Sequence, residues 1–289
     1  MCGRWPEEKR SRAGALSLLA ALLFAAAACT GRSEQDGHGA KQEEERTVAL
    51  RIVYDNYPDH PDLQTDWGFA CVVQGFEKTI LFDTGANGEI LLSNMKAVDV
   101  SPEDVDVVVL SHVHGDHTGG LETFLGRKSG VTVFMPASFP ERIKARARET
   151  GARVVAVDEP VTICEGVHST GEMGEQIKEQ ALVLRTSEGL AVITGCAHPG
   201  IVEMVKRATE LGPEPVHLVM GGYHLLHEPS QTIRSVIAMF REIGVRNVAP
   251  CHCSGDETRR MMKEAFGEGY LPAGAGTALV LHRQGEQGE

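Results

Sequence analysis

Short apolar runs alternate with amphipathic stretches from Val48 onward. Runs of about four to eight apolar residues, bounded by turn-forming residues, predict buried or half-buried strands. The predicted strands are Val48–Tyr54, Gly68–Val73, Thr79–Phe82, Val107–Leu110, Arg153–Val157, Leu218–Met220, Val248–Ala249 and Thr277–His282, with a hairpin of Ala181–Thr186 and Leu190–Thr194.

Helical periodicity fills several of the intervals between these strands. Ser138 and Pro140 occupy the positions of a cap and an early proline, and Gly151 follows the predicted end of that helix. Further helices are predicted at Ile201–Leu211, around Ile233–Phe240 and at Asp256–Phe266. This alternation predicts mixed sheets flanked by helices, an α/β layered architecture.

The N-terminal segment has a different composition. Basic residues precede the apolar run Leu16–Ala28, which is too short to span a bilayer comfortably and ends in small residues before Cys29. This arrangement resembles a bacterial lipobox, which predicts a lipoprotein-type signal peptide at 1–28, a lipid-anchored flexible tether at 29–47 and one domain at 48–289. The protein would then be exported to the periplasm or cell surface and anchored to the membrane through lipidated Cys29. The alternative is an ordinary cleaved signal with Cys29 incidental.

Charge and cysteine content narrow the function classes. The net charge of −12 would become −14 after loss of residues 1–28, which carry four basic and two acidic side chains. Such a chain is poorly suited to bind a nucleic acid backbone, so we expect a small-molecule substrate.

Five cysteines would remain beside Cys2 and Cys29, an odd number without the spacing of a disulfide framework. They are Cys71, Cys164, Cys196, Cys251 and Cys253.

A histidine-rich loop follows the predicted strand Val107–Leu110. In extended backbone His112 and His114 point to the same side, and Gly115 would permit a turn that brings Asp116 and His117 beside them. Three imidazoles and a carboxylate suit zinc or a similar metal. The alternative, an ordinary polar loop, would require this H-x-H-x-D-H order to arise by chance.

The run from His112 to His117 resembles the signature of the metallo-β-lactamase superfamily. The resemblance implies a four-layer αββα sandwich over about Val48–His282. It also implies that Asp83 supports the loop His112–His117, called the metal loop below, rather than binding metal. The resemblance further implies two metal sites. One would use His112, His114 and His198, and the other would use Asp116, His117 and His252.

One position departs from the superfamily pattern. Cys196 stands where a bridging aspartate usually ends the strand. Either Cys196 is a thiolate ligand, favoured by a nearby dication, or it is a small buried residue and the second metal binds weakly. The segments FDTG, SHVHGDHTGG, EQALVL, TGCAHPGI, GGYHL and PCHCSG together are similar to a narrower branch, the 7,8-dihydropterin-6-yl-methyl-4-(β-D-ribofuranosyl)aminobenzene 5'-phosphate synthase-like metal-dependent hydrolases.

The resemblance implies a metal-dependent hydrolase with two divalent ions, zinc first and Mn²⁺ or Fe²⁺ as alternatives. A metal-activated water would attack a small phosphoester or related ester, Asp116 would orient it, and His224 would protonate or anchor the leaving group. The loops Asn56–Asp66 and Glu165–Gln180 would shape the pocket. Two other readings remain open: a transferase of the synthase type, and a non-catalytic periplasmic domain that binds or senses metal.

Overall fold

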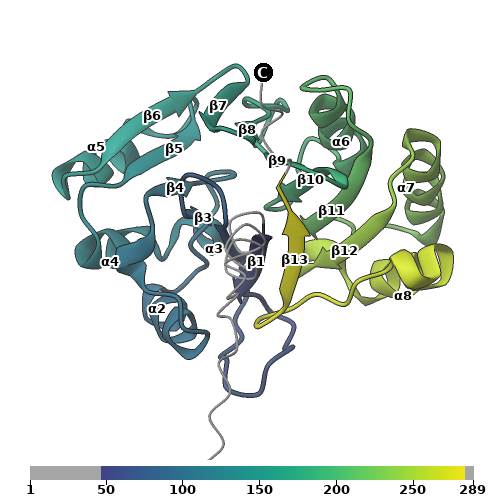
Figure 1. Ribbon diagram of the computed structural model, residues 1–289, viewed down its shortest axis with the longest axis horizontal. Helices are drawn as coiled ribbons and strands as arrows, with labels where there is room; N and C mark the ends of the chain where they lie inside the picture. The colour runs from purple at the N-terminus through teal and green to yellow at the C-terminus, as the bar shows by residue number, and fades with distance from the viewer. Residues whose placement is uncertain (1–46, 284–289) are drawn as a thin grey trace, which may run out of the picture.

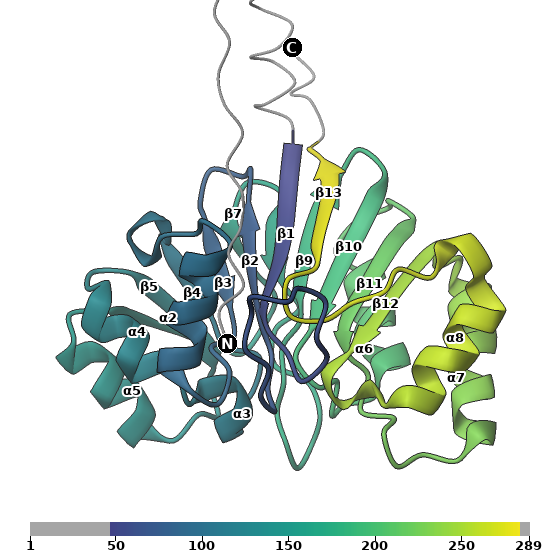
Figure 2. The same ribbon diagram turned by 90° about the horizontal axis from the view of Figure 1, so that it is seen from below.

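The computed structural model describes residues 47–283, in which two β-sheets lie face to face between two groups of helices (Figures 1 and 2). The strands are β1 (Thr47–Tyr54), β2 (Ala70–Gln74), β3 (Ile80–Phe82), β4 (Val107–Val109), β5 (Thr132–Pro136), β6 (Arg153–Val157), β7 (Val161–Cys164), β8 (Val167–Ser169), β9 (Leu182–Thr186), β10 (Gly189–Thr194), β11 (Val216–Gly222), β12 (Asn247–Cys251) and β13 (Ala278–His282). The helices are α2 (Gly88–Ala97), α3 (Gly115–Thr118), α4 (Leu121–Arg127), α5 (Glu141–Glu149), α6 (Ile201–Thr209), α7 (Ser230–Ile243) and α8 (Asp256–Phe266), with short 3-10 turns η1 (Pro102–Asp104), η2 (His252–Ser254) and η3 (Gly267–Gly269).

Strand order brings the ends of several parallel strands together. The first sheet runs β13-β1-β2-β3-β4-β5-β6 and the second runs β12-β11-β10-β9-β8-β7. Pairing is parallel from β3 to β6 and from β10 to β12, with Phe82 opposite Val109 and Ile193 opposite Met220. Loops that leave the carboxyl ends of these strands therefore gather at one edge of each sheet, where α/β folds commonly place their ligands.

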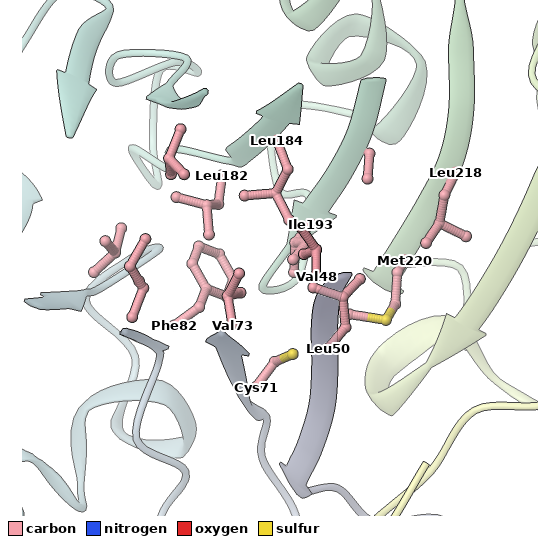
Figure 3. Close-up of a cluster of buried hydrophobic side chains, with 14 of the residues drawn as sticks. Val48, Leu50, Cys71, Val73, Phe82, Leu182, Leu184, Ile193, Leu218 and Met220 are labelled. Carbon is pink, nitrogen blue, oxygen red and sulfur yellow. The ribbon is translucent and has the colours of Figure 1, made fainter. Parts of the chain in front are cut away.

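The two sheets are held together by an apolar layer between them. Figure 3 shows side chains from both sheets meeting there, among them Leu50 and Phe82 of the first sheet and Leu182, Ile193 and Met220 of the second. All five are buried. Burial of side chains of this size stabilises the fold by about 1.5–3 kcal/mol each, so this layer fixes the relative position of the sheets.

Helices cover the outer face of each sheet. Leu91 of α2 and Phe124 of α4 pack with the first sheet, whereas Met204 of α6, Phe240 of α7 and Met262 of α8 pack with the second. The resulting order is helices, sheet, sheet, helices, which is the αββα sandwich that the motif implied. Among the described helices, none combines the length and apolarity needed to cross a membrane.

The predicted elements agree with the observed ones within two residues at most ends, and the hairpin of β9 and β10 is antiparallel as expected. Ser138 is not a helix cap: α5 follows Pro140, and the Ser138 N–H donates to Glu172 Oε2 at 3.0 Å. The predicted loop Glu165–Gln180 contains strand β8, and β1 begins at Thr47, inside the predicted tether. The predicted signal peptide, residues 1–28, and residues 29–46 of the predicted tether lie outside the described residues.

Candidate metal centre

The candidate ligands lie just after strands of both sheets. β4 leads to His112 and His114, β10 leads to Cys196 and His198, and β12 leads to His252. Helix α3, which carries Asp116 and His117, marks the same end of the sandwich in Figure 2. Because the sheets face each other, loops from the two halves of the chain meet at this edge.

The first group of ligand atoms belongs to His112, His114 and His198, all within 4.8 Å of one another. His112 Nε2 lies 3.2 Å from His114 Nδ1, and His112 is fully buried. His198 Nε2 is buried with no hydrogen-bond partner. An unpartnered buried imidazole nitrogen is costly, and a cation among these three rings would remove that cost.

The second group consists of Asp116, His117, Cys196 and His252, again within 4.8 Å. His117 Nε2 lies 3.2 Å from His252 Nε2 and 3.3 Å from Cys196 Sγ. Asp116 Oδ2 lies 3.4 Å from His252 Nε2 and 3.6 Å from His117 Nε2. A carboxylate, a thiol and two imidazoles converging in this way form a donor set that suits zinc.

Hydrogen bonds on the far side of each ring decide which nitrogen faces the centre. His117 Nδ1 lies 2.7 Å from Asp83 Oδ2, and His252 Nδ1 lies 2.9 Å from Asn56 Oδ1. Both partners are acceptors, so we assign the ring protons to Nδ1, which leaves two Nε2 lone pairs facing each other. The two Nε2 atoms at this distance need a cation between them, either a proton or a metal ion, and together with the nearby carboxylate and thiol they form a set that fits a bound metal.

Asp83 belongs to neither group and instead holds the metal loop in place. Its Oδ1 accepts from the Ser111 N–H and its Oδ2 from the Ser111 hydroxyl, both at 2.7 Å, in addition to the contact with His117. Asp83 adopts a left-handed φ of 58°. A side chain added at Gly195 would lie 2.1 Å from Ser111 Oγ, so the β10 loop packs directly on this network.

The turn after His114 forms differently from the prediction. Gly115 is the first residue of α3, outside the left-handed region, and a Cβ there would meet nothing within 4 Å. The backbone freedom of glycine is therefore not needed at this position. The helix itself turns the chain and brings Asp116 and His117 beside the two earlier histidines.

Glu179 is a residue of the site that the sequence did not reveal. It is fully buried, and its carboxylate accepts the backbone N–H groups of Cys196, Ala197 and His198 at 2.8–2.9 Å. It thereby fixes the loop that carries two candidate ligands. The available signal was an acidic residue directly before the apolar strand Ala181–Thr186, a position where a charge must find partners.

Asn56 was likewise not singled out, although it lies in a loop expected to shape the pocket. It accepts from His252 Nδ1 through Oδ1, and its amide also lies 3.4 Å from the His252 carbonyl oxygen. His252 has a left-handed φ of 47°. Asn56 therefore holds both the ring and the backbone of His252 in an uncommon conformation, as residues around functional sites often are.

Cys196 lies in the second group. The sequence left two interpretations open for it: a thiolate ligand, or a small buried residue beside a weakly bound second metal. Its Sγ faces His117 Nε2, whereas Cys253 Sγ donates to the Cys196 carbonyl oxygen at 3.6 Å. The five cysteines of the described residues are free and buried. A hydrogen bond with Cys253, followed by burial, raises the pKa of the Cys196 thiol, so the thiolate at this position needs a neighbouring cation.

His224 follows β11 and lies on the exposed side of the first group. Its ring centroid is 4.3 Å from that of His198, and its ligand atom falls within 4.8 Å of those of Cys196 and His198. Two glycines precede it in the chain. Added Cβ atoms at Gly221 and Gly222 would lie 2.1 and 2.3 Å from the carbonyl oxygens of Thr194 and Gly195, so these glycines allow β11 to lie close to β10.

Electrostatics separate the histidines into two kinds. Burial and facing imidazoles lower the pKa of His112, and burial together with His224 lowers the pKa of His198 to about 4. Burial alone would also lower the pKa of His117, but the carboxylates of Asp83, Asp116 and Glu179 raise it to about 9. His112 and His198 therefore present neutral rings, whereas His117 holds a proton that a metal would replace.

Comparison with known proteins agrees with the observed αββα fold and with the histidine-rich motif. The model of the metallo-β-lactamase superfamily matches residues 68–202. The structure superposes on a metal-dependent hydrolase of the β-lactamase superfamily with a TM-score of 0.68 and 25% identity, covering 80% of this chain and 98% of that one. The chain therefore has the metallo-β-lactamase fold and resembles the metallo-β-lactamase superfamily.

Two further known proteins resemble the chain, one in sequence and one in fold. The 7,8-dihydropterin-6-methyl-4-(beta-D-ribofuranosyl)-aminobenzene-5'-phosphate synthase of Methanocaldococcus jannaschii is 28% identical over 250 residues, which cover 71% of this chain and 85% of that protein. Human tRNase Z, short form, has the same fold, with a TM-score of 0.56 and 12% identity over 80% of this chain and 98% of that one. The branch suggested by the sequence motifs is thus also found among the relatives.

Proposed function

We propose that the chain is a metal-dependent hydrolase that cleaves a small phosphoester or related ester with an activated water. The observation that carries the proposal is the pair of Nε2 atoms of His117 and His252, 3.2 Å apart beside Asp116 and Cys196. The His112, His114 and His198 group adjoins them, with the ring centroids of His112 and His117 4.2 Å apart. Two adjacent donor groups are the arrangement that two-metal hydrolysis requires.

Two bound divalent ions would lower the pKa of a water and stabilise the negative charge that develops on the attacked oxygen. The residues supply the remaining steps. Asp116, one-fifth exposed, would accept a proton of the attacking water through its carboxylate. His224, whose pKa is raised chiefly by its hydrogen bond with Cys253, would donate a proton to the leaving group.

Zinc is the metal that the donors favour. Five imidazoles, one carboxylate and a thiol make up the two groups, and a thiol donor disfavours the harder ion manganese. In this proposal Cys196 contributes its thiolate to the second ion. Manganese and iron would still bind the first, all-histidine group, so metal preference would differ between the two positions.

The test is a turnover assay on the full chain with zinc or manganese restored. The substrates are chromogenic phosphomonoesters, phosphodiesters, lactones and β-lactams, and the variants are His114→Ala and, as a matched control, His282→Ala. We expect phosphodiester turnover that chelation abolishes, that His114→Ala removes and that His282→Ala retains. Metal binding without turnover on any substrate would instead favour the metal-sensing reading.

A transferase remains the second candidate, favoured by the 28% identity to the archaeal synthase. In that case an acceptor other than water would take the phosphoryl group, and the alcohol of the ester would leave with a proton. Turnover that appears only when an alcohol or amine acceptor is added to the same assay would select this candidate over hydrolysis.

We also propose that Cys29 is lipidated and anchors an exported protein, on the basis of the apolar run and small residues before it. A Cys29→Ser variant should then leave the membrane fraction and appear in the soluble periplasmic or culture fraction. An unchanged distribution would contradict the anchor.

A further inference from the structure

Large exposed apolar side chains are few among the residues that the structure describes. Within residues 47–283 they are Trp67, Leu226 and Val280, which are 44%, 42% and 60% exposed. Val280 belongs to strand β13, whereas the other two adjoin the segment His252–Gly255. Two of the three exposed apolar side chains thus lie beside the segment that carries His252, a member of the second donor group. Exposed apolar surface of this kind commonly marks a binding site.

Trp67 contacts a candidate metal ligand directly. Its ring centroid lies 4.8 Å from that of His252, with the planes inclined by 53°. His252 is fully buried and turns its Nε2 toward His117 and Asp116. Trp67 therefore covers one side of a ligand ring and leaves almost half of its own surface to solvent, next to the position where a substrate would react.

The backbone on both sides of Trp67 is fixed. The Trp67 N–H donates to Asp66 Oδ1 at 2.8 Å, and Asp66 Oδ2 accepts from the Tyr54 hydroxyl at 3.0 Å. On the other side, Phe69 N–H donates to the carbonyl oxygen of Asp116 at 3.3 Å. A Cβ at Gly68 would lie 2.4 Å from that same oxygen, so Trp67 is held against the metal loop itself.

Leu226 borders the same segment from the β11 side. Its N–H donates to the carbonyl oxygen of Cys253 at 3.1 Å. A Cβ at Gly255 would lie 2.7 Å from Leu226 Cα. The segment that holds His252 is therefore flanked by an indole and an exposed aliphatic side chain, both on anchored backbone.

We propose that Trp67 forms a subsite beside the second metal position that binds the flat, conjugated ring of an aryl ester substrate. This inference rests on the proposed function for the identity of the reacting group. Indole rings bind flat conjugated rings by stacking, which is stronger than the contact with an alkyl group of similar size. The subsite thus selects aryl over alkyl esters while the metal centre holds the ester group.

The experiment measures equilibrium binding of two inert probes, phenylphosphonate and methylphosphonate, to the zinc-loaded full chain by titration calorimetry. The unsubstituted protein should bind phenylphosphonate about 3- to 10-fold more tightly. Trp67→Leu should abolish the preference without weakening methylphosphonate binding, whereas Trp67→Phe should keep most of it. Val280→Ala, which removes exposed apolar surface away from the site, is the matched control and should change nothing.

Fluorescence supplies an independent readout. The chain has two tryptophans, so a Trp5→Phe background leaves Trp67 as the sole indole, and phenylphosphonate should change its emission more than methylphosphonate does. Equal affinities for the probes, no binding of either probe, or a preference that persists in Trp67→Leu would overturn the subsite. Aryl preference without turnover of any ester would support the subsite while contradicting the hydrolase. Turnover without aryl preference would do the reverse.

Discussion

The Nε2 atoms of His117 and His252 lie 3.2 Å apart although 135 residues separate them in the chain. Each ring is turned toward the other by an acceptor behind it, Asp83 for His117 and Asn56 for His252. The fold thus brings these two nitrogens to a distance that is favourable only with a cation between them, either the proton that His117 holds without metal or a metal ion. The following predictions test how this relationship is maintained.

Asp83→Asn should weaken binding of the second metal by about 10- to 100-fold, because the amide cannot orient and polarise His117 as a carboxylate does. Metal affinity can be measured by competition with a chromogenic chelator. Asp99→Asn is a matched control, since Asp99 is exposed and has a similar left-handed φ of 56°. Equal affinities in the two variants would show that Asp83 does not support the site.

Glu179→Gln should lower the free energy of unfolding by about 1–3 kcal/mol. In the glutamine, an amide NH2 group replaces one of the two carboxylate oxygens. That group cannot accept a hydrogen bond, so the backbone N–H groups of Cys196 and Ala197, or the N–H of His198, lose their acceptor. The free energy of unfolding is measured by urea denaturation after a chelator has removed the metal. Glu175→Gln, in the same loop but exposed, should stay within about 0.5 kcal/mol of the parent; a similar loss in both variants would argue against a special role for Glu179.

Cys196→Ser should remove the sulfur-to-metal charge-transfer absorption of the cobalt(II)-substituted protein. The reason is the position of Cys196 Sγ in the second donor group, 3.3 Å from His117 Nε2. Cys164→Ser, on strand β7, should keep the band. A band that survives in Cys196→Ser would favour the reading in which this cysteine is only a small buried residue.

Affinity for the second metal should rise with pH, and less steeply above about pH 9. Without metal, the pKa of His117 is raised to about 9 and the pKa of the Cys196 thiol is raised as well, so below pH 9 both groups must lose a proton before the metal can bind them. Two displaced protons give roughly a hundredfold gain in affinity per pH unit between pH 7 and 9, and one gives about a tenfold gain above pH 9. Chelator competition at several pH values, corrected for the protonation of the chelator, measures the slope. A flat profile over this range is the opposing result.

The sequence predicted the parts of the site whose geometry is local. His112, His114, Asp116 and His117 lie within six residues, and their positions follow from a strand that ends and a short helix that begins. The grouping of His198 and His252 with them came from family resemblance, because nothing in a pattern of apolar residues places two distant loops side by side.

Residues that act through long-range contacts escaped prediction for the same reason. Glu179 contacts a loop 17 to 19 residues away, and Asn56 contacts His252 across 196 residues. The short strands β5, β7 and β8 and the helix α2 were also missed. The strands are only three to five residues long and α2 has three consecutive apolar residues, so neither shows a clear period, and packing against the rest of the fold decides their structure.

The donor atoms come from strand ends in both sheets, with His117 near the middle of the chain and His252 near its end. A nascent chain therefore has an incomplete second donor group until its last quarter has been synthesised and the two sheets have closed on each other. A chain would hold the second ion with full affinity only after it has folded completely. Partly folded chains would lose the ion to competing chelators. Metal retention in a cell would then distinguish finished molecules from unfinished ones.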